Sequence, residues 1–136
     1  MRTILAFTLV LVAGLILGGL AQTLHAQSPA VRNTSVLRAD MTGLQATEGY
    51  LNVVEQAPGA IGRKQYHTGD VFFYVMTGSM TLEMDGRSAV SINQGQAFHL
   101  DPKTVITPRN ASTSAPVKFL VFGLVGKGQS PSVQVP

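Results

Sequence analysis

The sequence predicts an all-β domain, a sandwich or barrel of short strands joined by turns. Strand-like runs recur roughly every 8 to 12 residues after Gln27, with no helical periodicity between them. All 7 Pro and most of the 14 Gly lie in this part, where they would interrupt a long helix. Hydrophobic residues make up 45% and charged residues 12%, which excludes disorder for most of the chain. The length of 136 residues suits one domain.

Two features of the composition exclude several functions. There is no Cys, so disulfides, zinc–thiolate sites, iron–sulfur clusters and thiol catalysis are excluded. The formal net charge is only +3, and no basic run is longer than Arg63-Lys64. Nucleic-acid binders usually cluster basic residues with aromatic ones, so we expect no nucleic-acid partner.

Residues 1–26 have the order of a secretory signal peptide. Arg2 precedes an uncharged apolar run of 17 residues, Ile4–Leu20, and Ala26 provides a small residue for cleavage. The alternative is an uncleaved membrane anchor, although 17 residues is near the short limit for a spanning helix. We therefore expect a periplasmic or secreted domain with no membrane contact after cleavage.

The rest of the chain divides into a lead-in, a barrel and a tail. Residues 27–35 are polar and predict a flexible lead-in, residues 36–131 form the barrel, and residues 132–136 are a loose or edge-hugging tail. Asp85-Gly86 predicts a tight hairpin turn. The run at Val117–Val125 is apolar on both faces and indicates a central strand or a subunit contact. We expect strands at Tyr50–Gln56, Val71–Met76, Met80–Met84, Ser88–Ile92, Ala97–Leu100, Val105–Thr107 and Val117–Val125.

The turn spacing resembles that of the cupin family, whose two motifs are G-x5-H-x-H-x3-E-x6-G and G-x5-P-x-G-x2-H-x3-N. Gly59, Gly78 and Gly95 fit the glycine positions, and His67 and Asn110 fit one further position each. The resemblance covers about residues 36–131, including a GKG-x-x-P tail similar to that of small exported bacterial cupins. It implies a jelly-roll barrel, the double-stranded β-helix.

The departures from these motifs affect the metal site. In metal-binding cupins, two His and a Glu of the first motif and a His of the second hold one divalent metal. Here three of those positions are Gln65, Val71 and Ile106, and only His67 remains. Valine and isoleucine cannot ligate, and an amide is a poor ligand, so we expect no metal cofactor. The alternative is a rebuilt site of His67 and His99 with Asp70 or Asp101.

The resemblance places His67 inside the barrel, and strand alternation then puts Arg63 and Gln65 on the same face. We expect Val71, Phe73 and Ile106 to line the same pocket. An apolar pocket with a few polar groups suits a small organic ligand, without catalysis. Three alternatives stay open: a closed, vestigial pocket, a site for a partner, and a metal-dependent oxygenase or isomerase with an unusual ligand set.

Two further expectations concern His67 and self-association. Gln65 is the nearest candidate hydrogen-bond partner for His67, and the charge of Arg63 should lower the pKa of His67.

Phe72, Tyr74 and either Phe119 or Phe122 should point outward from one sheet. Such a patch favours a homodimer, unless Val36–Ala46 covers it within the same chain.

Overall fold

The computed structural model describes residues 29–45 and 47–136. The predicted signal peptide and the first two residues of the predicted lead-in lie outside this range. From residue 29 onward, Ala46 aside, the chain contains strands and turns but no helix. Accordingly, this part of the chain has no helix that could span a membrane.

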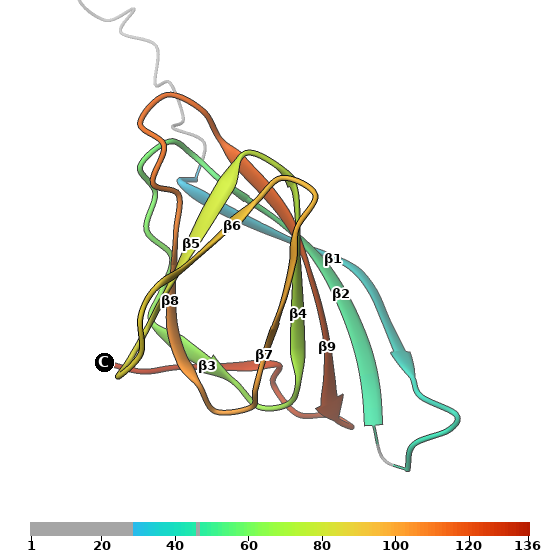
Figure 1. The fold of residues 1–136 in the computed structure, drawn as a ribbon. Coiled ribbons are helices and arrows are strands. Elements are labelled where there is room, and N and C mark those ends of the chain that lie inside the picture. The colour runs from blue at the N-terminus through green and yellow to red at the C-terminus, as the bar shows by residue number, and fades with distance from the viewer. Residues whose placement is uncertain (1–28, 46) are drawn as a thin grey trace, which may run out of the picture.

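Two five-stranded antiparallel sheets pack face to face and enclose the interior (Figure 1). Sheet A has the order β1-β2-β9-β4-β7, and sheet B has the order β10-β3-β8-β5-β6. The predicted all-β fold of two packed sheets is confirmed. The strands are β1 (Val31–Asp40), β2 (Thr47–Gln56), β3 (Gln65–His67), β4 (Val71–Thr77), β5 (Ser79–Met84), β6 (Val90–Asn93), β7 (Ala97–Leu100), β8 (Val105–Arg109), β9 (Val117–Gly126) and β10 (Ser132–Gln134).

Strand alternation separates the core from the outer face of sheet A. In β4, Val71, Phe73 and Val75 are buried, whereas Phe72 and Tyr74 are exposed. The same alternation holds in β9, which lies between β2 and β4. Its central place explains why its sequence is apolar on both faces, as predicted.

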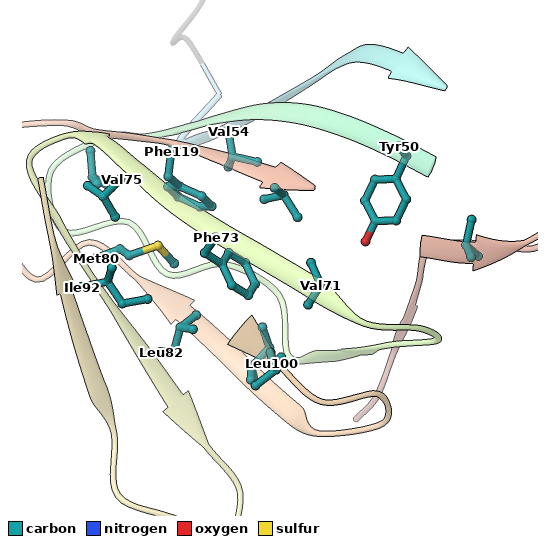
Figure 2. Close-up of a cluster of buried hydrophobic side chains, with 14 residues drawn as sticks. Tyr50, Val54, Val71, Phe73, Val75, Met80, Leu82, Ile92, Leu100 and Phe119 are labelled. Atoms are coloured by element: carbon teal, nitrogen blue, oxygen red, sulfur yellow. The ribbon is translucent and has the colours of Figure 1, made fainter. Parts of the chain in front are cut away.

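The core joins both sheets (Figure 2). Phe73 and Phe119 of sheet A lie with ring centroids 6.3 Å apart. Met80, Leu82 and Ile92 of sheet B are at most 2% exposed. This packing fills the side of the interior next to β5 and β6.

The two ends of the described chain are more ordered than the sequence predicted. The expected flexible lead-in, residues 27–35, already contains the first half of β1, which pairs along its length with β2. The expected tail, residues 132–136, contains β10, which pairs with β3. Both are edge strands whose side chains are largely exposed, so their sequences carry no burial alternation, and backbone pairing supplies the order.

The hairpin between β5 and β6 is longer than predicted. Met84 and Arg87 close a turn around Asp85-Gly86, with Gly86 at φ +71°. However, strand pairing resumes only at Leu82 and Val90. The last residues of β5 pair with β8 instead.

The outer face of sheet A carries an aromatic patch. Phe72, Tyr74 and Phe122 are each at least 40% exposed, and Phe72 stacks on Phe122 with centroids 6.1 Å apart. Phe119, the other outward candidate, is buried. Residues 36–40 belong to β1, which β2 and β9 separate from β4. Met41, however, lies beside Phe122, since both side chains lie over Gly49, so the segment that follows β1 reaches one end of the patch.

Self-association through this face stays a prediction. Because the patch exposes aromatic surface to water, the double substitution Phe72→Ser and Phe122→Ser should shift the protein from dimer to monomer, with little effect on folding. Light scattering at increasing protein concentration measures this change. Arg87→Ser, in the exposed loop of sheet B, is the control. A parent protein that remains a monomer at high concentration would contradict the prediction.

Candidate ligand-binding cavity

A cavity of about 540 Å³ occupies the interior on the side of β2 and β3. Five of the six residues predicted to form a pocket line it: Arg63, Gln65, His67, Phe73 and Ile106. The sixth, Val71, is completely buried in the core and is not part of the lining. Ile106 therefore forms part of the cavity wall and does not fill the cavity.

The short strand β3 contributes polar side chains to one wall of the cavity. Gln65 is the direct cross-strand neighbour of Ile106 in β8 and of Gln134 in β10, and all three line the cavity. His67 lies two residues further along the same face and is 5% exposed. Arg63 precedes the strand and is exposed. Thus the predicted group of Arg63, Gln65 and His67 does share one cavity.

The hydrogen-bond partner of His67 differs from the prediction. The hydroxyl of Tyr50 lies 3.1 Å from Nδ1 of His67, whereas Gln65 makes no hydrogen bond to it. Tyr50 projects inward from β2 (Figure 2). Its ring lies over Gly123 of β9, where an added Cβ would be only 2.6 Å from Cζ of Tyr50. Gly123 therefore provides the space for the Tyr50–His67 pair. This pair was not predicted from the sequence.

The pair defines a tautomer for His67. Burial raises the pKa of Tyr50 to about 12, so its hydroxyl keeps its proton at neutral pH. No described residue other than His67 is hydrogen-bonded to this hydroxyl, so its proton has a partner only in the arrangement in which it donates to Nδ1. The proton of a neutral imidazole then lies on Nε2. Nε2 is buried, and no residue in the described part of the chain partners it.

His67 is neutral at physiological pH for a different reason from the predicted one. Burial lowers the pKa of His67 to about 4, since an imidazolium would lose its hydration. The carbonyl of Pro131 opposes this shift, although it is not within hydrogen-bond geometry of Nε2 of His67. The predicted cause, the charge of Arg63, is wrong, because Arg63 is exposed and burial accounts for the lowered pKa of His67.

The lowered pKa predicts a pH-dependent stability. Between pH 6.5 and about 4, the unfolded chain binds a proton at His67 that the folded chain does not. The free energy of unfolding should therefore be fully retained above pH 6.5 and fall as the pH approaches 4, by about 3 kcal/mol in total. Urea unfolding across this range measures the slope.

His67→Gln should flatten that slope, because the amide that replaces the imidazole does not titrate. An unchanged slope in His67→Gln would assign the pH dependence to other groups.

Gln56 and Asn110 form a second buried polar group beside the cavity. Gln56 is 1% exposed and lines the cavity. Its Nε2 makes one long contact of 3.5 Å to the carbonyl of Pro108, and its Oε1 has no partner among the described residues. Asn110 is also 1% exposed and donates to the carbonyls of Gln56, Ala57 and Ala115. Asn110 thus holds the end of β2 in place.

The alternative metal cluster does not assemble. Nε2 of His99 lies 2.8 Å from Oδ1 of Asp70, and the imidazole stacks on Phe72 on the outer face of sheet A. Asp101 is exposed and does not line the cavity. Within residues 29–45 and 47–136, no three His, Asp or Glu side chains are grouped so that they could hold a metal ion. The rebuilt site of His67, His99 and Asp70 or Asp101 is therefore wrong.

The comparisons with known proteins agree with this barrel. Residues 52–123, just over half of the chain, match the family model described as the Cupin domain. The chain belongs to the cupin family. No curated protein matches it.

Several solved structures share the fold of this cupin at low sequence identity. An uncharacterized conserved protein with a double-stranded β-helix domain from Klebsiella pneumoniae has a TM-score of 0.64 and 14% identity, over 81% of this chain and 88% of that one. A cupin superfamily protein from Desulfitobacterium hafniense has a TM-score of 0.60 and 12% identity, over 75% and 84%. The DMSP lyase of Ruegeria pomeroyi has a TM-score of 0.63 and 13% identity, over 84% and 56%. The predicted double-stranded β-helix is thereby confirmed.

The side chains at the four ligand positions of the cupin motifs do not suit the binding of a divalent metal in this protein. At the four ligand positions, Gln65 and Ile106 are cross-strand neighbours in the cavity wall, and Val71 lies in the core. One neutral imidazole and one amide fall short of the three protein ligands of a catalytic metal centre.

Proposed function

We propose that this cupin binds a small organic ligand in the cavity between its sheets, without a metal and without catalysis. The observation that carries the proposal is that two buried polar atoms beside one cavity, Oε1 of Gln56 and Nε2 of His67, have no partner among the described residues. An unpartnered buried polar atom costs about 1 to 3 kcal/mol. A bound polar molecule would offset that cost, and the cavity volume is typical of small-molecule sites.

The proposal is tested by a fragment screen that follows the amide resonances of the intact domain. We expect the responding resonances to cluster at β2, β3 and β8. Gln65→Trp should abolish the response, because it fills the cavity from a half-buried lining position, whereas Gln94→Trp, in an exposed turn, should not. A library that shifts no cavity resonance would favour a vestigial pocket.

The second candidate function is a metal-dependent cupin enzyme with an unusual ligand set. It is favoured only by family membership and by His67 at one ligand position. Elemental analysis of the purified protein distinguishes the two. We expect less than stoichiometric transition metal, and about one tightly held iron, manganese, nickel, copper or zinc per chain would overturn our proposal.

We also propose that the domain acts outside the cytoplasm, in the periplasm or as a secreted protein. The support is the order of residues 1–26, a basic start followed by an apolar run and a small residue. Mass spectrometry of the protein recovered after expression of the full chain tests this. An N-terminus at Gln27 supports export with cleavage, whereas an intact chain found in the cytoplasm contradicts it.

A further inference from the structure

Five amide side chains line the cavity from both sheets. Asn33 comes from β1, Asn52 and Gln56 from β2, Gln65 from β3 and Gln134 from β10. Gln65 and Gln134 are direct cross-strand neighbours. Within the described residues, the only hydrogen bond made by any of these five side chains is the long contact from Gln56 to Pro108. The wall therefore offers several amide donors and acceptors.

Amides both donate and accept hydrogen bonds, and so do hydroxyl groups. A ligand with several hydroxyl groups can satisfy such a wall, whereas a purely apolar ligand would leave its amides without partners. The N–H at Nε2 of His67 and the acceptor Oε1 of Gln56 extend the same pattern to the buried part of the wall.

The charge of the lining indicates a single anionic group on the ligand. Arg63 is the one charged side chain among the described lining residues, since they include no Asp or Glu and His67 is neutral. No described carboxylate forms an ion pair with Arg63. A guanidinium pairs a carboxylate through two parallel hydrogen bonds.

The apolar part of the wall fits the carbon skeleton of such a ligand. The rings of Tyr50, Phe73 and Phe119 all line the cavity. Aromatic faces of this kind can pack against the C–H groups of a ring or chain, leaving its hydroxyls directed toward the amides. Apolar surface, amides and one cation thus lie around a single volume.

We infer that the ligand is a small monocarboxylate bearing several hydroxyl groups, a sugar acid in chemical class, with its carboxylate at Arg63 and its hydroxyls at the amides. This inference rests on the proposed function of the cavity. It adds the ligand class to that proposal and assigns specificity to Arg63 and to the amides.

Calorimetric titration of the intact domain with four probes tests the inference: D-gluconate, D-glucuronate, D-glucose and benzoate. At least one sugar acid should bind about tenfold or more tightly than glucose and benzoate, because only the sugar acids use both the cation and the amides. Arg63→Gln should remove the advantage of the sugar acid over glucose. Arg87→Gln, an exposed arginine outside the cavity, should leave it unchanged.

A second pair of variants tests the amides. Gln65→Leu should weaken the sugar acid several-fold and leave benzoate unchanged or tighter, whereas Gln94→Leu should affect neither. Tighter binding of benzoate than of both sugar acids would overturn the ligand class, as would binding of none of the four probes. The fragment screen then decides separately whether the cavity binds ligands at all.

Discussion

Replacing Asn110 by Asp should lower the free energy of unfolding by about 2 to 4 kcal/mol. The two N–H groups of the Asn110 amide are shared among three backbone carbonyls, 2.9 to 3.2 Å from Nδ2, and its Oδ1 accepts from the N–H of Ser112. A carboxylate has the same shape but only accepts hydrogen bonds, so it would face three carbonyls without a donor. Urea unfolding at neutral pH measures the loss.

Asn93→Asp is the matched control, because Asn93 is exposed and its Oδ1 already accepts from the hydroxyl of Ser79. We expect that variant to stay within about 0.5 kcal/mol of the parent. A similarly small change in Asn110→Asp would show that water replaces the amide and that this residue does not hold the end of β2.

The sequence predicted the strands that bury a regular face. Apolar and polar residues alternate in β5, so its two-residue period is visible without a structure. In β4 the aromatic and β-branched composition indicated a strand, and its alternate residues are buried. The edge strands β1 and β10 escaped prediction because their order comes from backbone pairing with a neighbour distant in the sequence. No side-chain pattern records such pairing.

The part of the candidate site that could be predicted is the part that follows from the inward or outward alternation of a single strand, β3. Once His67 is placed inward, alternation places Gln65 on the same wall, and the structure agrees. The hydrogen bond from Tyr50 to His67 depends instead on two strands in different sheets and on the space above Gly123. Strand alternation could have shown that Tyr50 shares a face with Gln56, but not that this face meets His67.

The neutral state of His67 shows the same limit. The sequence places Arg63 four residues away, which made charge repulsion the natural explanation of a lowered pKa. In the structure, burial is the cause, and burial depends on strands from both sheets. The direction of the pKa shift of His67 could be predicted from the short sequence separation of Arg63 and His67. Its cause could be identified only from the packing of the folded chain.

Rebuilding the family's ligand set should create a metal site that the parent lacks. The triple variant Gln65→His, Val71→Glu and Ile106→His places three new ligand side chains around His67. Gln65 and Ile106 are cross-strand neighbours, and Val71 pairs through Gly123 with Tyr50, which contacts His67. We expect about one divalent metal per chain by elemental analysis.

Stability gives a second, independent measurement. Without metal, the introduced Glu lies at a completely buried position, so the apo variant should be less stable than the parent. With metal at about 1,000 times its dissociation constant, the variant should gain about 4 kcal/mol. Nε2 of His67 would bind the metal, and the Tyr50 hydroxyl would rotate to accept the proton on Nδ1.

Removing the imidazole provides the control: adding His67→Gln to the triple variant should remove both the bound metal and the stabilisation by metal. If the triple variant folds yet holds no metal, the four positions do not converge. The family's motif register would then not apply to residues 65–106, and the absence of a metal site in this cupin could not be attributed to Gln65, Val71 and Ile106.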